Sequence, residues 1–342
     1  MLNILTIDLE DYFMVSAFEG VVKREDWKNY ESRIERNTYR LLDLLNHSSC
    51  NPIRATFFCI GWVAERHPQF IREIHQRGHE IACHSYDHRR IYHMSPDEFR
   101  EDIRKSRKIL EDIVGEEVIG YRAPSYSITN KSQWAFEILA EEGFKYDSSI
   151  FPIHHDLYGM PDAPRFPFVI SLNENNNFEF SMLNCEFNTA SLNNCSTAAP
   201  NINPSSEVSA PQHGNTAAPL EGITPNSEPR TPNCLLEFPL STIKVFGQNF
   251  PISGGGYFRL FPYDLIKYGL KRINEKENKP FVFYLHPWGI DPEQPRINGL
   301  SSRSKFRHYV NLDKTEEKFG RLLKDFNFSS VKEIMQLNNS IT

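Results

Sequence analysis

The sequence predicts an α/β fold in which parallel strands alternate with helices and form a barrel. Short apolar segments of strand length alternate with amphipathic segments of helical length, a pattern that favours a parallel sheet covered by helices. In addition, five polar residues each directly follow a predicted strand, and groups at the carboxyl ends of barrel strands converge on one mouth. These residues are Asp8, His84, Arg122, Asp147 and His286.

The predicted strands are short and mostly apolar, as expected for strands that are covered on both faces. They lie at 2–7, 55–60, 80–83, 118–121, 144–146 and 281–285. The predicted helices lie at 37–46, 68–77, 96–114, 132–142 and 314–326. Ser95, Pro96 and Glu98 form a capping signal before the helix at 96–114, and Gly115 is expected to end it.

One segment departs from this alternation. The chain has no aromatic residue from Asn188 to Glu237 and is rich there in Asn, Ser, Thr, Ala and Pro. Such a composition buries too little apolar surface to offset the entropy of ordering. We therefore expect a disordered or loosely ordered insertion at about 188–233 within a single domain of 1–342.

The bulk properties describe a globular protein without a nucleic-acid partner. Of the 342 residues, 39% are hydrophobic and 24% are charged, which allows a sizeable core. The net charge of -6 and the absence of a basic run argue against binding to nucleic acid. No apolar run is long enough for a membrane helix. The N-terminus lacks the features of a signal peptide, so a cytoplasmic location and six reduced cysteines are expected.

Two motifs supply possible metal ligands. His84 and His88 are four residues apart after a predicted strand, and Asp8, Glu10 and Asp11 cluster after another. Two histidines and one carboxylate can hold a divalent cation and leave positions open for water and substrate. Each motif also has a simpler interpretation, namely a chance pair of histidines and a solvated acidic turn.

Three further residues could serve the same site. Arg122, before Ala123 and Pro124, offers a fixed positive charge on a rigid turn, although a surface ion pair would explain it equally well. His286 ends a strongly apolar segment. It could be a core histidine or, beside a metal, a general acid. Asp147 could cap a turn or orient His286.

The ordered set of motifs resembles the NodB-type polysaccharide deacetylases, carbohydrate esterase family 4. The resemblance rests on Thr6-Ile7-Asp8, Ala55-Thr56-Phe57-Phe58, Gly78-His79-Glu80-Ile81 with His84-Ser85-x-x-His88, Arg122-Ala123-Pro124, Tyr146-Asp147-Ser148-Ser149 and Leu285-His286-Pro287. A part at about 250–340 resembles a narrower branch, the deacetylases of exosortase (PEP-CTERM)-linked exopolysaccharide loci. That likeness rests on Ser253-Gly254-Gly255-Gly256-Tyr257-Phe258-Arg259, His286-Pro287-Trp288, 291–296 and Arg307-His308-Tyr309.

The resemblance implies a distorted (β/α)7 barrel that holds a Zn²⁺-type metal through one carboxylate and two histidines. It places Asp8 as general base, His84 and His88 as metal ligands, and His286 as general acid. It also implies that Arg122 fixes the base and that Asp147 orients the catalytic histidine.

The sequence departs from the family at one point. The family motif has two adjacent aspartates, whereas Leu9 follows Asp8 here. The carboxylate ligand is then Glu10, which shares a strand face with Asp8, or Asp11, if the chain has already turned. Asp11 is slightly preferred because its shorter side chain is closer to the usual ligand. Zn²⁺ is the expected cofactor, and Co²⁺, Mn²⁺, Fe²⁺ or Ni²⁺ would also suit these ligands.

Four residues are expected to contact substrate. They are Tyr126, Tyr257, Arg259 and Trp288. A backbone N–H near Tyr126 would hold the oxyanion, as the family suggests, and the Gly254–Gly256 run would form either a wall of the sugar cleft or a tight turn.

The expected function is therefore removal of N-acetyl groups from N-acetylhexosamine units of a polysaccharide, in exopolysaccharide biosynthesis. The expected partner is an N-acetylated glycan. The alternatives are a metal amidase acting on a small non-glycan amide and a non-catalytic glycan-binding barrel.

Overall fold

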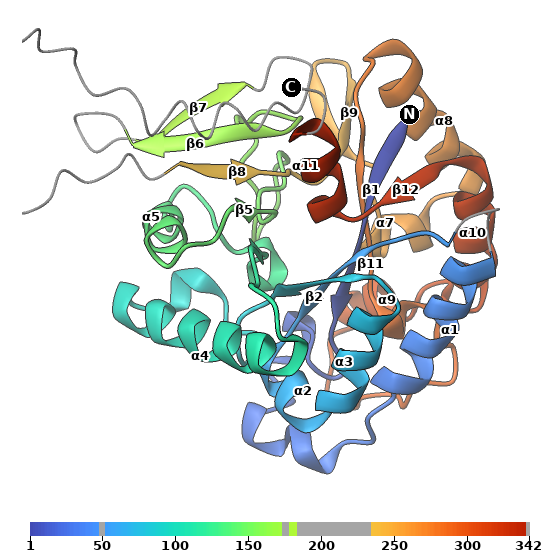
Figure 1. Cartoon of the computed structure of the whole chain (residues 1–342). Coiled ribbons are helices and arrows are strands. Elements are labelled where there is room, and N and C mark those ends of the chain that lie inside the picture. Colours follow the sequence, from blue (N-terminus) through green and yellow to red (C-terminus); the bar gives the residue numbers. More distant parts are fainter. Residues whose placement is uncertain (48–51, 173–177, 183–233, 340–342) are drawn as a thin grey trace, which may run out of the picture.

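The computed structural model describes residues 1–47, 52–172, 178–182 and 234–339 (Figure 1). The predicted insertion at 188–233 lies outside these residues. No helix in the described ranges is both long and apolar enough to cross a membrane.

A curved sheet forms the centre of the molecule. Seven of its described strands run parallel, in the spatial order β11-β1-β2-β3-β4-β5-β8. Their bounds are β1 Leu2–Leu9, β2 Thr56–Cys59, β3 Glu80–Cys83, β4 Gly120–Tyr121, β5 Tyr146–Asp147, β8 Leu235–Glu237 and β11 Val282–Leu285. Strands β6 (Phe168–Leu172) and β7 (Phe178–Met182) extend the β8 edge in antiparallel fashion, and β12 (Asn327–Ser329) pairs with the start of β1. The predicted α/β fold with a distorted seven-stranded barrel is thereby confirmed.

The barrel is distorted because β8 and β11 do not pair with each other among the described strands. The connection between them lies along the open edge of β11. The Val282 N–H donates to Ser241 Oγ at 2.8 Å, and the Tyr284 N–H donates to the Ser253 carbonyl at 2.9 Å. Gly254 adds one isolated parallel bridge to Tyr284. This contact, which we call the seam, takes the place of a full ladder.

Helices surround the sheet (Figure 1). Their bounds are α1 Ile34–His47, α2 Gly61–Arg66, α3 Pro68–Gln76, α4 Pro96–Val114, α5 Trp134–Glu141, α7 Gly255–Leu260, α8 Tyr263–Lys276, α9 Ser302–Tyr309, α10 Leu312–Asp325 and α11 Val331–Asn339. The hairpin β9 (Thr242–Val245) and β10 (Gln248–Pro251) precedes α7. The predicted bounds of α4 are confirmed, and Ser95 and Glu98 form the expected capping box.

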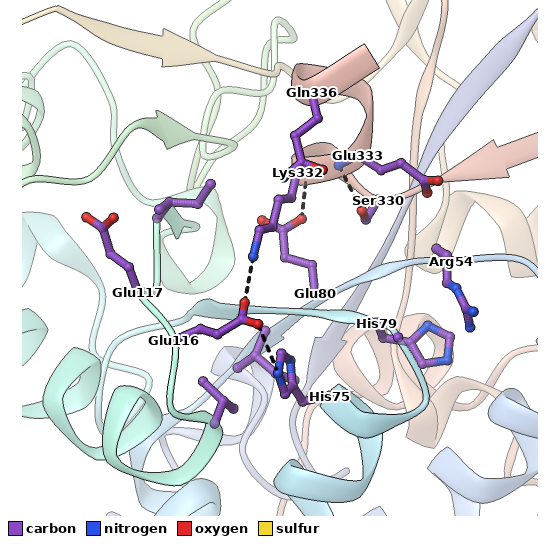
Figure 2. A pocket seen from close by; sticks show the side chains of 14 residues that line it. Arg54, His75, His79, Glu80, Glu116, Glu117, Ser330, Lys332, Glu333 and Gln336 are labelled. Carbon is purple, nitrogen blue, oxygen red and sulfur yellow. Dashed lines mark hydrogen bonds and ion pairs between the residues drawn. The ribbon is translucent and has the colours of Figure 1, made fainter. Parts of the chain in front are cut away.

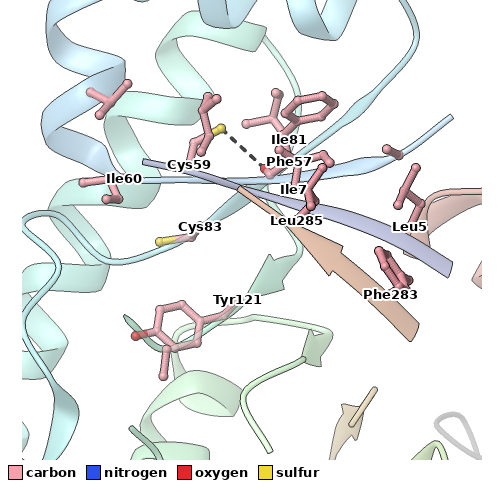
Figure 3. Packing of buried hydrophobic residues seen from close by; sticks show 14 of the residues in the cluster. Leu5, Ile7, Phe57, Cys59, Ile60, Ile81, Cys83, Tyr121, Phe283 and Leu285 are labelled. Carbon is pink, nitrogen blue, oxygen red and sulfur yellow. Dashed lines mark hydrogen bonds between the residues drawn. The ribbon is translucent and has the colours of Figure 1, made fainter. Parts of the chain in front are cut away.

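Strand alternation divides the apolar residues into two clusters. Leu5 and Ile7 of β1 pack with Phe57, Ile81 and Phe283 in the cluster that joins the sheet to the helices (Figure 3). Residues at the intervening positions form a second cluster inside the barrel, which α11 covers at the amino-terminal end of the strands. Its members include Ile4, Phe58, Ala82, Tyr146, Val282, Tyr284, Val331 and Ile334. Because successive side chains of a strand point to opposite faces, the even-numbered positions of these strands face the interior.

The cysteines fit the expectation only in part. Cys59 and Cys83 are free, fully buried thiols that belong to the cluster between sheet and helices. Cys234 is disulfide-bonded. The expectation that all six cysteines are reduced is therefore wrong at this position.

The seam should be sensitive to a single methyl group. Gly254 has φ 133°, a conformation that is essentially restricted to glycine, and a Cβ there would lie 1.9 Å from the Tyr284 carbonyl oxygen. We expect Gly254→Ala to lower the free energy of unfolding by about 3 kcal/mol, from backbone strain and overpacking together.

Gly247→Ala is the matched control, because Gly247 has φ 81° but a Cβ added there would meet no atom within 4 Å. It should cost only about 1 kcal/mol of backbone strain. Urea unfolding of the two variants measures the difference, and equal losses would contradict the close contact at the seam.

Candidate metal and catalytic site

The polar residues predicted from the strand ends meet at the carboxyl-terminal end of the barrel. Asp8, Glu10, His84, His88 and His286 line one cavity of about 530 Å³. They come from β1, from the loop after β3 and from the end of β11, so segments far apart in sequence supply a single site. Of the five residues predicted to converge, Asp8, His84 and His286 line the cavity, whereas Arg122 and Asp147 do not.

Glu10, His84 and His88 form a buried cluster with the geometry of a metal site. One ligand atom from each lies within 4.8 Å of the others. Glu10 Oε2 is 2.9 Å from His88 Nε2, yet this oxygen has no hydrogen-bond partner of acceptable geometry, and His88 Nδ1 has none either. Unsatisfied buried atoms are rare in proteins. A divalent cation bound by the three side chains would satisfy the carboxylate oxygen, so this donor set fits the implied metal.

The structure corrects the preference for Asp11 over Glu10. Strand β1 continues through Leu9, so Glu10 keeps the inward direction of Asp8. Asp11 turns away, and its carboxylate accepts hydrogen bonds from Ser32 Oγ at 2.7 Å and from the Arg33 N–H at 3.0 Å. It is absent from the cluster of possible ligands. Asp11 therefore anchors the segment before α1, and Glu10 is the carboxylate placed for the metal.

The pKa values of the Glu10 and Asp11 carboxyl groups also favour Glu10 as the ligand. Burial opposes ionisation of Glu10, but the neighbouring His88 lowers the pKa of Glu10 to about 2. For Asp11, burial raises the pKa to about 6. Glu10 is thus the residue that remains an anionic ligand over the physiological pH range.

Hydrogen bonds from outside the metal cluster orient the histidines and their loop. His84 Nδ1 lies 2.7 Å from the Arg122 carbonyl oxygen, an acceptor, so Nδ1 carries the proton and the lone pair of Nε2 is free. Ser85 and His88 adopt left-handed φ values of 59° and 58°. Asp102 of α4 supports this unusual loop because its Oδ2 accepts the Tyr86 N–H at 3.0 Å.

Asp8 is paired with Arg122 beneath the cavity. Arg122 Nη1 donates to Asp8 Oδ1 at 2.6 Å, and Tyr126 Oη donates to Asp8 Oδ2 at 3.2 Å. Burial alone would raise the pKa of Asp8, but Arg122 lowers it below its ordinary value. Arg122 is completely buried and also donates to Thr6 and Ser148. The predicted role of Arg122 in fixing the carboxylate agrees with this geometry.

His286 faces the same carboxylates. Its Nε2 lies 3.3 Å from Glu10 Oε1 and 3.8 Å from Asp8 Oδ2, and its ring stacks on Trp288. Burial lowers the pKa of His286 below its ordinary value. Its Nδ1 has no hydrogen-bond partner.

The structure does not place Asp147 as the residue that orients His286. Asp147 occupies an outward-facing position of β5, and its carboxylate hydrogen-bonds to Ser149 and Glu237. Burial raises the pKa values of both Asp147 and Glu237, and the Asp147 carboxylate raises that of Glu237 further, so Glu237 is the partner that keeps its proton. Tyr146 and Ser148 take the neighbouring inward positions, so strand alternation explains why Asp147 points away from the cavity.

The predicted substrate residues all line the cavity, but with different contacts. The Tyr126 N–H donates to the Ala123 carbonyl, so this N–H is not free to hold an oxyanion. Trp288 Nε1 donates to Glu10 Oε1 at 3.2 Å. Tyr257 is partly exposed, whereas Arg259 is buried with its guanidinium 4.8 Å from the Trp288 ring centroid.

The cavity wall contains residues to which the sequence assigned no definite role. His308 stacks on Trp288 with ring centroids 4.3 Å apart, and its Nε2 lies 2.6 Å from Gln294 Oε1. His155 and Arg303 also line the cavity. Only the Arg307-His308-Tyr309 motif gave a signal for this region, because the other wall residues belong to no recognisable pattern.

A second pocket lies at the opposite end of the barrel, between the start of β3 and α11 (Figure 2). Three of its side chains form ion pairs with one another. Lys332 Nζ lies 2.7 Å from Glu116 Oε2, and His75 Nε2 lies 3.6 Å from Glu116 Oε1. This pairing is typical of a structural surface, so the chemistry is assigned to the cavity at the carboxyl-terminal end.

Two family models match the chain. Residues 27–146 match the model described as polysaccharide deacetylase, and residues 205–336 match a domain of unknown function, DUF3473. A solved structure from Mycobacterium smegmatis, described as a candidate polysaccharide deacetylase, has a TM-score of 0.52 at 16% identity. The alignment covers 99% of this chain and 91% of that one, which shows that the two share a fold.

Curated relatives match a shorter segment. The peptidoglycan-N-acetylglucosamine deacetylase of Bacillus cereus is 34% identical over 101 residues, which cover 29% of this chain and 36% of that protein. The peptidoglycan deacetylase of Helicobacter pylori is 31% identical over 102 residues, 30% of this chain and 33% of that protein. The chain thus spans about a third of the length of these relatives. Together with the family model, the matches support assignment to the polysaccharide deacetylase family.

The two candidate carboxylates can be separated by metal titration. Glu10→Gln should lower the affinity for Zn²⁺ by more than the roughly 10–100-fold that loss of an outer-shell partner costs, because a direct ligand is removed. Asp11→Asn should retain Zn²⁺, because Asp11 contacts Ser32 and Arg33 and not the cluster. Calorimetric titration measures both, and a reversed order would restore Asp11 as the ligand.

The Asp102 contact predicts a dependence of stability on pH. Burial raises the pKa of Asp102 to about 7, so the folded state binds this proton more tightly than the unfolded state does. The resulting stabilisation is present below about pH 4 and is lost as the pH rises to 7. The wild type should therefore lose up to about 4 kcal/mol of unfolding free energy between pH 4 and pH 8 through this group. Asp102→Asn cannot ionise at this position and should not show this loss. Denaturant unfolding of both proteins at the two pH values tests this. If the difference in unfolding free energy between them is the same at pH 4 and pH 8, the pKa of Asp102 is not raised in the folded protein.

Proposed function

We propose that the chain, which matches the polysaccharide deacetylase family over residues 27–146, is a metal-dependent hydrolase. It removes N-acetyl groups from N-acetylhexosamine units of a polysaccharide. One observation carries this proposal: Asp8, held by Arg122, lies in the same cavity as the Glu10, His84 and His88 cluster and as His286. A proton acceptor, a cation site and a proton donor are thereby brought together.

A divalent cation held by Glu10, His84 and His88, with Zn²⁺ as the first choice, would polarise the amide carbonyl and acidify water. The residues of the chain supply the proton transfers. Arg122 keeps Asp8 ionised, so Asp8 can accept a proton from the attacking water. The Tyr126 hydroxyl donates to the second oxygen of Asp8 and fixes its direction.

His286 completes the reaction on the leaving group. Water adds to the carbonyl carbon, the C–N bond breaks, and His286 Nε2 donates the proton that the departing amine requires. The products are acetate and a free amine on the sugar. Since burial lowers the pKa of His286, the free protein holds this ring neutral, and the ring must receive its proton within the site. Asp8 Oδ2, at 3.8 Å, is the nearest base that takes up a proton during the reaction.

The substrate class is supported by the relatives, whose names identify them as peptidoglycan deacetylases. We assign the chain more narrowly to exopolysaccharide biosynthesis, which rests on the motifs at 253–259 and 286–288 and on Arg307-His308-Tyr309. The cavity wall includes the exposed side chains of Arg303, Phe306 and Arg307. An open wall of this kind favours an extended glycan over a small enclosed amide.

Acetate release from N-acetylglucosamine oligomers tests the proposal. Metal-loaded wild type should release acetate, and chelated protein or Asp8→Asn should not, because the cation or the proton acceptor is lost. His286→Ala should lower kcat by roughly 10²–10⁴ if the ring is the general acid.

His47→Ala is the control, since His47 is an exposed histidine at the end of α1. Its activity should equal that of the wild type. Release that persists in Asp8→Asn would contradict the assigned base. A protein that binds metal but releases no acetate would instead favour an amidase with another substrate, and one that binds glycan without metal would favour a binding role.

A further inference from the structure

Arg259 carries a buried positive charge that the proposed reaction does not use. It belongs to α7, and only 2% of the residue is exposed. Its Nη2 donates to the Arg307 carbonyl oxygen at 2.8 Å, but Nε and Nη1 have no hydrogen-bond partner. Within the described part of the chain, no carboxylate forms an ion pair with this guanidinium. Burial lowers the pKa of Arg259 to about 10, so it remains protonated at neutral pH.

A buried cation without a counterion is costly to a fold, and buried charges in proteins are normally paired. Arg259 lines the same cavity as the metal cluster. Nε and Nη1 themselves have almost no exposed surface, so a ligand in the cavity reaches them only when the side chains around them shift. An anion is the group that would offset the charge.

Other cationic side chains of the cavity wall add to the positive charge of Arg259. Arg303 and Arg307 of α9 line the cavity and are exposed. Arg303 Nη2 lies 3.7 Å from Asp156 Oδ2 in an exposed ion pair, so Arg307 is the stronger contributor. The acidic residues that line it are Asp8 and Glu10, which are engaged with Arg122 and with the metal cluster. The whole chain has a net charge of -6, so this cationic wall is a local feature.

We propose that Arg259, assisted by Arg303 and Arg307, binds a carboxylate on the glycan. The substrate is accordingly an acidic polysaccharide in which a carboxylate-bearing sugar adjoins the N-acetylhexosamine. The inference rests on the proposed function, because the same cavity must receive the N-acetyl group. Guanidinium groups are the preferred protein partners of carboxylates.

The position of Arg259 favours a neighbouring sugar over the acetate that the reaction releases. The Trp288 indole contacts both the metal cluster and Arg259. Its Nε1 contacts Glu10, whereas its ring lies 4.8 Å from the Arg259 guanidinium. Arg259 thus contacts the indole and forms no ion pair with Asp8 or Glu10.

A matched pair of ligands isolates the carboxylate. One is a tetrasaccharide that alternates N-acetylglucosamine with glucuronate, and the other is its carboxyl-reduced form, in which each glucuronate has become glucose. Calorimetric binding to the chelated full chain requires no turnover. It therefore tests the anion site even if the deacetylase reaction fails, and kcat/KM on the zinc-loaded chain provides the second measurement.

The wild type should bind the acidic tetrasaccharide roughly 10–100-fold more tightly than its reduced form, as expected for charge-assisted hydrogen bonds. Arg259→Gln should abolish this ratio. Arg307→Gln should lower it in a salt-dependent manner, because exposed charges are screened. Lys305→Gln removes one exposed charge from the same helix, outside this cavity, and should leave the ratio unchanged.

Equal affinity of the wild type for both tetrasaccharides would overturn the proposal, whatever the variants do. The binding of free acetate is a further measurement. Acetate binding that depends on Arg259, without preference for the acidic tetrasaccharide, would assign the residue to product and would likewise overturn the proposal.

Discussion

The site depends on the buried ion pair between Arg122 and Asp8. The Arg122 side chain connects three strands of the barrel, because it contacts Asp8 and Thr6 of β1 and Ser148 at the end of β5 from its own place after β4. Its carbonyl group holds His84 in the tautomer that presents Nε2. One residue thus fixes the charge state of the base and the orientation of a metal ligand. A buried pair of this kind tolerates the loss of neither partner, because the remaining charge would be stranded away from water.

The alternation of side chains along the strands determines which residues take part. Even-numbered positions of β1 and β11 face the interior, so Asp8 and His286 enter the cavity. Glu10 follows at the end of β1, where its N–H donates to the Asp8 carbonyl at 3.0 Å in a three-residue turn. The same rule excludes Asp147, which pairs with Glu237 on the outer face of the sheet. Both its place after a strand and the family resemblance suggested that Asp147 orients His286, whereas its side chain contacts Ser149 and Glu237.

The sequence was sufficient to predict the fold class, most of the parallel strands and the convergence of Asp8, His84, His88, Arg122 and His286. Each of these signals is local, because an apolar strand followed by a polar residue can be read directly from the chain. The choice between Glu10 and Asp11 could not be made, since it depends on whether β1 ends at Ile7 or at Leu9. The part of the wall formed by His155 and Arg303 was also missed. Its residues come together only when α9 folds over the mouth, and no periodic pattern signals such a contact.

The seam gives the two halves of the cavity different mechanical support. Asp8, Glu10 and His84 lie at the ends of strands that are paired along their length, whereas α7 follows directly from the single bridge between Gly254 and Tyr284. Local opening requires the least free energy where the fewest backbone hydrogen bonds must break. Fluctuations of the barrel will therefore displace the wall that carries Arg259 more readily than the groups that perform the chemistry. As a consequence, mutations near the seam can change the choice of sugar over evolutionary time while the hydrolytic machinery stays intact.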